Sequence, residues 1–538
     1  MTERDDVVRH GLPPRAQWPD MIFTLPELRY PARLNAVAEL LDRWMPAGHG
    51  AAPCVISPAG VWSYAEFAAR INRICNVLVH RLGLRPGQTV LMRAPNSPMM
   101  AACILAVMKA GGVAVPTMPM LRARELAYPL TKARIEIALC DARLLPDLEA
   151  AAAEAPDFAR IVAFNTDAAG GLEAMMAAES DQFAAADTAA EDICLIAFTS
   201  GTTGEPKGTM HFHRDMLATC DSYGRHVLGA GMSDRFIGSP PLAFTFGFGG
   251  HVLFPLRVGA ATILLERAGP DDLIDAIPRY RPTICFTAPT AYRAILARHG
   301  EADLGSLRKC VSAGEHLPEA TFEAWRAATG LALMDGIGST ELLHIFIGSP
   351  PEEAIPGATG RVVPGYEARI IDADGAPLPD GTAGRLAVRG PTGGRYMADK
   401  RQATYVQDGW NITGDSFVRD EAGYFWYQAR NDDMIVSSGY NIAGPEVEAI
   451  LLQHAAVAEC AVIGVPDAAR GMIVTAVVVL APGHTGDAGM TEALQNHVKA
   501  TIAPYKYPRA ILYRDALPKT PTGKLQRYLL REDATARL

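Results

Sequence analysis

The segment from Thr199 to Gly208 carries the densest set of groups in the chain that could bind a ligand. It reads Thr199-Ser200-Gly201-Thr202-Thr203-Gly204-Glu205-Pro206-Lys207-Gly208 and directly follows an apolar stretch, residues 192–198, that predicts a buried strand. Its glycines let the backbone approach a ligand closely, while four hydroxyls, the loop amides and Lys207 offer donors and a cation. These properties favour a polyphosphate ligand. Pro206 precedes the lysine and no Ser or Thr follows it, which excludes a Walker A loop.

Six further motifs follow one another along the chain. They are residues 109–119 (KAGGVAVPTMP), Ser312-Ala313-Gly314-Glu315, Gly336-Ile337-Gly338-Ser339-Thr340-Glu341, Thr413-Gly414-Asp415, Arg430 with Asp432 and Asp433, and Pro521-Thr522-Gly523-Lys524. Each charged residue, taken alone, reads as a solvated charge or a structural pair. The joint order and spacing resemble the adenylate-forming superfamily, which includes acyl- and aryl-CoA ligases, luciferases and the adenylation domains of peptide synthetases. The resemblance covers nearly the whole chain.

The resemblance implies a role for each motif. It implies that the phosphates are held by Thr199, Ser200, Gly201, Thr202, Thr203, Gly204 and Lys207. It implies that AMP is bound by Ala313, Gly314, Glu315, Gly336, Ile337, Thr340, Asp415 and Arg430, the last two on the ribose. Glu341 would ligate Mg²⁺, Lys524 would be the catalytic lysine, and Asp432 would be the hinge. The channel for coenzyme A would be lined by Ser438, Gly439 and Tyr440.

The implied reaction requires positive charge, because a carboxylate that attacks the α-phosphate of ATP brings two anions together. Lys524 and Mg²⁺ on Glu341 would supply that charge, while Lys207 and the loop hydroxyls would hold the β- and γ-phosphates. In-line displacement of this kind depends mainly on positioning and charge stabilisation. By the resemblance, the C-terminal domain then rotates about the hinge, so that one small domain serves two half-reactions.

The acid substrate is predicted from residues 240–250 and from the residues after Glu341. Residues 240–250 contain no carboxylate, whereas adenylation domains that activate amino acids typically place an Asp there to bind the ammonium group. The stretch Leu342-Leu343-His344-Ile345-Phe346 closely resembles benzoate- and 2-aminobenzoate-CoA ligases. This likeness implies a flat aromatic slot lined by Phe244, Thr245, Phe246, Gly338, His344 and Ile345. The alternative for the phenylalanines and for His344 is an ordinary place in the hydrophobic core.

Three functions follow from these observations. The leading one is an aryl-CoA ligase that uses ATP, Mg²⁺ and coenzyme A on an aromatic acid such as benzoate or 2-aminobenzoate. The alternatives are a medium-chain acyl-CoA ligase with a long apolar tunnel, and a stand-alone adenylating enzyme that loads a carrier protein. His211 and His213 lie two residues apart near the phosphate loop with no third ligand, and they are interpreted as structural.

The elements that must position these residues alternate between helices and strands. Residues 63–82 show helical spacing with Ser63 and Glu66 in a capping-box pattern, and a strand (89–94) and a helix (99–112) follow. This rhythm predicts an α/β fold with mixed or parallel sheets under helical cover. The pattern changes near residue 430. We therefore expect a large N-terminal domain over residues 1–431 and a small, mobile α+β domain over residues 432–538.

Composition bounds the class of protein. The chain has 538 residues and a net charge of −9, and this acidic balance argues against nucleic-acid binding. No run approaches the ~20 apolar residues that a membrane helix needs, and no secretory leader is visible. The nine cysteines are scattered singly, which favours a reducing compartment and neither a zinc site nor a disulfide framework. A cytoplasmic enzyme is expected, and a homodimer is left open.

Overall fold

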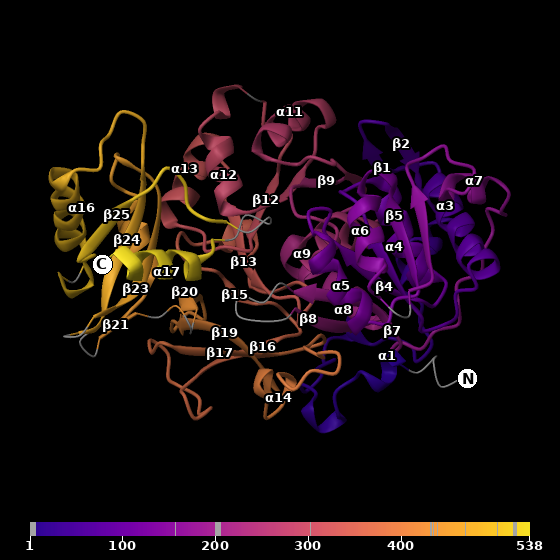
Figure 1. Ribbon diagram of the computed structural model, residues 1–538, viewed down its shortest axis with the longest axis horizontal. Helices are drawn as coiled ribbons and strands as arrows, with labels where there is room; N and C mark the ends of the chain where they lie inside the picture. The colour runs from indigo at the N-terminus through magenta and orange to yellow at the C-terminus, as the bar shows by residue number, and fades with distance from the viewer. Residues whose placement is uncertain are drawn as a thin grey trace.

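The computed structural model describes most of the chain. The described residues are 7–155, 158–199, 206–301, 303–430, 433, 435–437, 440–467, 470–502, 504–519 and 525–537. Their strands form four sheets. Figure 1 shows β1 to β5 toward one end of the long axis and β21 to β25 with α16 and α17 at the other end.

The six-stranded sheet positions the phosphate segment. Its order is β6-β5-β3-β4-β7-β8, and all neighbours are parallel except the last pair, β7 and β8. The strands are β3 (Thr89–Arg93), β4 (Val113–Thr117), β5 (Ile137–Asp141), β6 (Arg160–Phe164), β7 (Ile193–Thr199) and β8 (Lys207–Phe212). Parallel strands of this kind read as continuous apolar runs because both of their faces are covered.

Helices between these strands bury their apolar faces on the sheet. The helix α3 begins with the expected capping box, in which Ser63 and Glu66 each satisfy the other's backbone N–H. Every residue of α4 except Pro98 is buried, as expected for a helix that is apolar all round. The helices up to residue 219 are α1 (Val7–His10), α2 (Ala36–Leu40), α3 (Tyr64–Asn76), α4 (Pro98–Lys109), α5 (Ala123–Lys132), α6 (Leu145–Ala152), α7 (Leu172–Ala177) and α8 (His213–Thr219).

The nine-stranded sheet has the order β15-β14-β13-β12-β11-β9-β10-β1-β2. Its centre, from β13 to β1, is parallel, and antiparallel strands close both edges. The strands are β1 (Pro53–Ser57), β2 (Gly60–Ser63), β9 (Arg235–Gly238), β10 (Ala261–Ile263), β11 (Ile284–Thr287), β12 (Lys309–Ala313), β13 (Leu333–Gly338), β14 (Ile345–Gly348) and β15 (Arg361–Val362). The accompanying helices are α9 (Thr245–Phe248), α10 (Phe254–Val258), α11 (Pro270–Tyr280), α12 (Pro289–Leu296) and α13 (Glu319–Thr329).

Two smaller sheets complete the fold. The first joins β16 (Glu367–Ile371), β17 (Gly384–Arg389), β18 (Val406–Gln407), β19 (Trp410–Arg419) and β20 (Phe425–Arg430), with α14 (Gln402–Tyr405) beside it. The second joins β21 (Ile435–Ser437), β22 (Tyr440–Ile442), β23 (Val457–Asp467), β24 (Gly471–Leu480) and β25 (Ala510–Tyr513). The helices of the second sheet are α15 (Gly444–Leu451), α16 (Ala488–Thr501) and α17 (Arg527–Arg537).

The expected fold class is confirmed: mixed and parallel sheets with helical cover precede a small α+β unit. The helix with Pro445 in its first turn and the long strand pair β23 and β24 lie where the sequence predicted them. The boundary at residues 431 and 432 falls outside the described residues and stays a prediction. Among the described residues, no helix is both long and apolar enough to cross a membrane.

Candidate active site

The phosphate segment connects two antiparallel strands. Thr199 ends β7 and pairs with Lys207, the first residue of β8. Ser200, Gly201, Thr202, Thr203 and Gly204 lie outside the described residues. The two ends of the segment are therefore fixed side by side at one edge of the six-stranded sheet.

Lys207 and Glu341 meet through Tyr396. The Nζ of Lys207 lies 3.3 Å from the Oη of Tyr396 and 4.8 Å from the centre of its ring, and that Oη donates to Oε1 of Glu341 over 2.5 Å. Burial lowers the pKa of Lys207, while the charge of Glu341 opposes that shift. Burial and the same carboxylate raise the pKa of Tyr396, so the phenol stays protonated and remains a donor.

A buried chain of polar groups holds the backbone beside Glu341. The Nε2 of His211 donates to the carbonyl of Thr340 at 2.8 Å, and its Nδ1 lies 3.8 Å from Asp215. Asp215 pairs with Arg395 at 2.9 Å, with both side chains inaccessible to solvent. Burial raises the pKa of Asp215, but Arg395, His211 and Arg214 together outweigh this and lower it to about 2. A paired, ionised carboxylate thus lies beside the histidine that bonds Thr340.

The two expected adenine segments lie side by side at the carboxyl ends of adjacent parallel strands. Ala313, the last residue of β12, pairs with Gly336 of β13. Gly314 follows with φ of 89°, a left-handed conformation that glycine adopts without strain. Burial raises the pKa of Glu315, and the hydrogen bond from the Thr290 hydroxyl, 3.5 Å away, offsets part of that rise. Ligands of parallel sheets bind at such carboxyl ends.

Asp415 and Arg430 face each other across β19 and β20. They are register partners, and their side chains form an ion pair at 3.2 Å. The charge of Arg430 also acts on Lys207, and both Asp415 and Glu341 act on Tyr405. The proposed ribose residues therefore lie in the electrostatic surroundings of the Lys207 and Glu341 cluster.

Part of the expected aromatic slot is brought together. The Nε2 of His344 donates to the carbonyl of Phe246 at 3.3 Å, and the two rings lie 5.5 Å apart. Ile345 pairs with Gly338, and a Cβ on Gly338 would lie 2.6 Å from the His344 carbonyl oxygen. Burial lowers the pKa of His344 to about 3, so the ring is neutral at pH 7.

Phe244 and Thr245 have other neighbours. They line a small pocket with Pro116, Leu195, Ala197, Leu242, Ala243 and Phe248, on the side of α9 that faces β4 and β7. Their membership of one slot with His344 stays a prediction.

The sequence matches the AMP-binding enzyme family over residues 42–396 and its C-terminal domain over residues 446–524. The chain belongs to the AMP-binding enzymes. A benzoate–CoA ligase of Thauera aromatica is 37% identical over 515 residues, 94% of this chain and 98% of the relative. The structure of the anthranilate CoA ligase AuaEII in complex with anthranoyl-AMP superimposes with a TM-score of 0.91 at 34% identity, covering 95% of this chain and 99% of the other. A benzoate CoA ligase from Burkholderia xenovorans LB400 gives 0.85 at 31%, covering 93% and 100%.

These similarities confirm the resemblance inferred from the motifs. They also confirm the expected class of enzyme, an AMP-forming acid–thiol ligase. Use of ATP and coenzyme A is supported by the same family membership. Residues 397–445 lie between the two matched regions, so the domain boundary stays a prediction.

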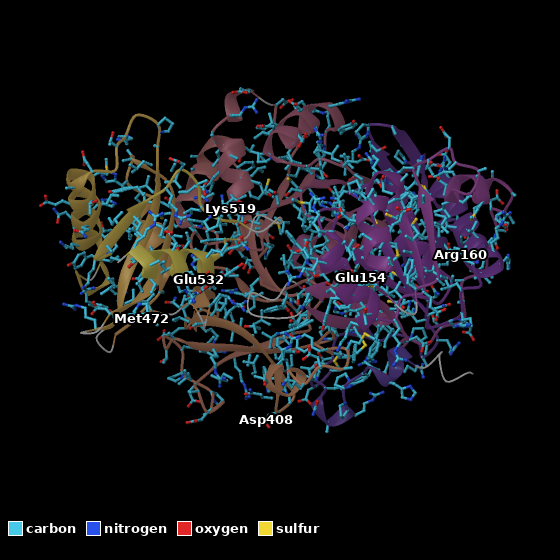
Figure 2. The ribbon with its side chains drawn as sticks, viewed as in Figure 1. Glu154, Arg160, Asp408, Met472, Lys519 and Glu532 are labelled. Atoms are coloured by element: carbon cyan, nitrogen blue, oxygen red, sulfur yellow. The ribbon has the colours of Figure 1, made fainter. Side chains whose placement is uncertain are left out.

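Several expected residues of this AMP-binding enzyme lie outside the described residues: Lys524, Asp432, Ser438 and Gly439. Tyr440 is the first residue of β22 and pairs with Ser437. Lys519, five residues before Lys524, bonds Glu459 at 2.7 Å. Burial raises the pKa of Glu315, and the charge of Lys519 offsets a small part of that rise. Figure 2 shows Lys519 just below the helix that Figure 1 labels α12, on the side of the C-terminal unit that faces the rest of the chain. The segment that carries the expected catalytic lysine thus starts beside the expected adenine site.

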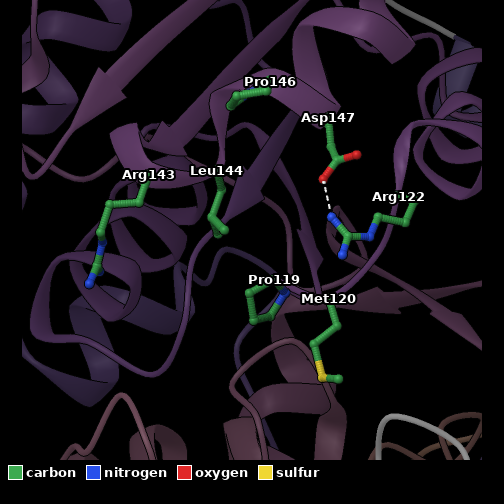
Figure 3. A pocket seen from close by; sticks show the side chains of 7 residues that line it. All are labelled: Pro119, Met120, Arg122, Arg143, Leu144, Pro146 and Asp147. Atoms are coloured by element: carbon green, nitrogen blue, oxygen red, sulfur yellow. Dashed lines mark hydrogen bonds and ion pairs between the residues drawn. The ribbon is translucent and has the colours of Figure 1, made fainter.

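An open cleft of about 490 Å³ lies at the carboxyl ends of β4 and β5 and is lined by none of the expected site residues. Figure 3 shows Arg122 paired with Asp147 at 3.2 Å across it. Arg143 points away from that pair and bonds Asp141 and Glu266, each at 2.7 Å. The lining residues are Pro119, Met120, Arg122, Arg143, Leu144, Pro146 and Asp147.

Sequence reasoning missed the residues that connect the motifs. Tyr396, Arg395 and Asp215 lie outside every quoted motif, yet they hold Glu341, Lys207 and Thr340. The one available signal was Gly393-Gly394 before Arg395-Tyr396, since paired glycines mark a close backbone approach. His211 and His213 are both buried and bonded, His213 through Nδ1 to the N–H of Ala36 at 3.1 Å, which matches their structural interpretation.

Proposed function

We propose that the enzyme is an aryl-CoA ligase of the benzoate or 2-aminobenzoate type. It converts ATP, an aromatic carboxylic acid and coenzyme A to aryl-CoA, AMP and diphosphate through an acyl-adenylate. The observation that carries the proposal is the grouping of His344, Phe246 and Gly338. The named activities of the benzoate and anthranilate ligases that resemble the chain support the same substrate class.

Glycines favour a short, flat slot over a long tunnel. A Cβ on Gly338 would press on the backbone of His344, and one on Gly249 would overlap the His344 ring. The ring of Phe286 closes the cluster, 5.7 Å from Phe246 and 6.1 Å from His344. Aromatic rings prefer tilted and edge contacts at such separations, and the ring of an aromatic acid would join this cluster through contacts of the same kind.

The residues present fit Mg²⁺ with Glu341 as its protein ligand. Among the described residues, no group of three or more His, Cys, Asp or Glu side chains could hold a metal. Mg²⁺ commonly uses one or two carboxylates together with substrate phosphates and water, and Glu341 is a half-buried carboxylate that Tyr396 orients. When bound, Mg²⁺ would neutralise phosphate charge.

In the first half-reaction, a carboxylate oxygen of the acid attacks the α-phosphorus of ATP and diphosphate leaves. Lys207 holds the β- and γ-phosphates with the hydroxyls of Thr199 to Thr203. Lys524 stabilises the charge between the two reacting anions, the kind of electrostatic contribution that lowers such barriers most. Ala313, Gly314 and Gly336 hold the adenine, and Asp415 with Arg430 holds the ribose.

In the second half-reaction, the thiol sulfur of coenzyme A attacks the acyl carbon, the C–O bond to AMP breaks, and the thiol proton is released. The C-terminal domain, residues 432–538, turns about Asp432 between the two steps and withdraws Lys524. Ser438, Gly439 and Tyr440 then line the pantetheine channel. The nine cysteines of the chain are free and buried, which supports a reducing, cytoplasmic location.

One experiment distinguishes this proposal from its two alternatives, a medium-chain acyl-CoA ligase and an adenylating enzyme that loads a carrier protein. A panel of carboxylic acids is incubated with ATP and Mg²⁺, with and without coenzyme A, while diphosphate is measured and thioesters are detected by mass. Aryl-CoA formed with strict dependence on coenzyme A is the expected result. A preference for medium-chain acids indicates the acyl-CoA ligase. Adenylation without thioester formation indicates a carrier-loading enzyme.

A further inference from the structure

His251 is a buried histidine that no motif or mechanistic step uses. It lies in the π-helical turn Gly249–Leu253, which continues directly from α9. Only 1% of its surface is exposed, and burial lowers its pKa to about 4. The ring is therefore neutral at pH 7, with one nitrogen that donates and one that accepts a hydrogen bond.

Neither ring nitrogen of His251 has a hydrogen-bond partner among the described residues. Three other buried histidines each have one: His211 bonds Thr340, His213 bonds Ala36, and His344 bonds Phe246. A buried polar group without a partner costs stability, and such groups are rare enough in native proteins to require an explanation. The donor and the acceptor of the His251 ring are therefore both available to a bound ligand.

The ring of His251 borders the same aromatic cluster as the acid slot. It meets the Phe286 ring edge-on at 6.3 Å, and Phe286 in turn contacts both Phe246 and His344. Two glycines leave the space that the rings of His251 and Phe286 occupy. A Cβ on Gly238 would lie 2.8 Å from Cε1 of His251, and one on Gly250 would lie 2.9 Å from the Phe286 ring. The fold therefore leaves room for a polar ring beside Phe286, at the border of this aromatic cluster.

We propose that His251 is a specificity-determining residue that hydrogen-bonds a hydroxyl or amino substituent on the ring of the aromatic acid. The inference rests on the proposed aryl-CoA ligase function and assigns to it a substrate with a polar ring substituent. An unsubstituted ring leaves both nitrogens unpaired. A hydroxyl or amino group can satisfy one of them, and a site built for such a bond rejects the analogue that lacks it.

The test compares hydroxybenzoates with methylbenzoates substituted at the same ring position, since the two groups are similar in size and only the hydroxyl forms hydrogen bonds. We expect at least one hydroxybenzoate to exceed its methyl counterpart in kcat/KM by about 10- to 100-fold in the wild type. His251→Leu should bring that ratio near one while benzoate turnover changes little. His251→Asn, which keeps a donor and an acceptor, should restore part of the ratio.

Thermal unfolding gives a second, substrate-free readout. Because His251 has no partner to lose, His251→Leu should leave Tm unchanged or raise it. The matched control His213→Leu removes a bonded histidine and should lower Tm. A lowered Tm for His251→Leu together with an unchanged hydroxyl-to-methyl ratio overturns the inference while the aryl-CoA ligase stands. A wild type that activates no aromatic acid overturns both.

Discussion

The hydroxyl of Tyr396 donates to Glu341 over 2.5 Å while the same oxygen lies 3.3 Å from the Nζ of Lys207. A distance of this size is typical of a hydrogen bond to an ionised carboxylate. One phenol therefore sets the spacing between the residue proposed to hold Mg²⁺ and the residue proposed to hold the outer phosphates. Tyr396 touches neither reacting atom in this arrangement and acts as a positioning residue.

Replacement of Tyr396 by Phe should weaken the response to Mg²⁺ more than the binding of the acid. Losing one hydrogen bond to a charged group costs about 1.5–3 kcal/mol, so we expect roughly a 10- to 100-fold loss in kcat/KM for ATP. The measurement is diphosphate release over a Mg²⁺ titration, with the KM of the acid as internal reference. Tyr424→Phe removes a hydroxyl that donates to the Glu353 carbonyl and serves as control. An unchanged Mg²⁺ dependence would show that Tyr396 does not position Glu341.

Lys524→Ala should abolish acyl-AMP formation and leave thioester formation from supplied acyl-AMP largely intact. In the proposed mechanism, the lysine faces the reacting phosphate only while the acid is adenylated. Both half-reactions are measured separately, with exposed Lys499→Ala on α16 as the matched lysine control. Equal losses in the two half-reactions would contradict a mechanism in which the C-terminal domain withdraws Lys524 before the second half-reaction.

Gly338→Ala should reduce kcat/KM for aromatic acids by about 10- to 100-fold, because overpacking costs about 1–3 kcal/mol. The new methyl group would lie 2.6 Å from the His344 carbonyl oxygen. The backbone of His344, which borders the proposed slot, would have to move. Gly170→Ala is the control, since a Cβ there meets nothing within 4 Å. Unaltered aryl turnover in Gly338→Ala would place the ring elsewhere.

The buried His213 predicts a pH dependence of stability. Burial lowers its pKa from 6.5 to about 4. Between these values the unfolded chain binds a proton that the folded chain does not, so the free energy of unfolding falls as pH drops from 6.5 to 4, by at most about 1.4 kcal/mol per pH unit. His213→Gln lacks this term. The Tm advantage of the wild type over His213→Gln should therefore shrink from pH 7 to pH 4.5, and a constant difference would contradict the shift.

Local signals in the sequence predicted local structure. The capping box joins Ser63 and Glu66, which are three positions apart, and the strand before Thr199 follows from one apolar run. Both are determined by neighbours in the chain, which is why they could be read without a structure. The resemblance also implied that the segments of Ala313 and Gly336 flank one adenine, and the two residues are register partners in β12 and β13.

The contacts that connect the motifs could not be predicted in this way. Tyr396 lies 55 residues from Glu341, and Arg395 lies 180 residues from Asp215. Pairings of this range depend on how the sheets pack, which no spacing in the sequence encodes. His251 was overlooked for a related reason: a single histidine in an apolar stretch reads as core, and only its unpartnered nitrogens distinguish it.

The most direct test of the aromatic slot is a comparison of kcat/KM for benzoate, 2-aminobenzoate and octanoate with the wild-type enzyme, measured as CoA thioester formed. The slot proposed around Phe246, His344 and Gly338 predicts that kcat/KM for the aromatic acids exceeds that for octanoate by at least tenfold, which corresponds to a difference of about 1.4 kcal/mol. Octanoate as the best of the three would contradict the slot and favour an acyl tunnel in its place.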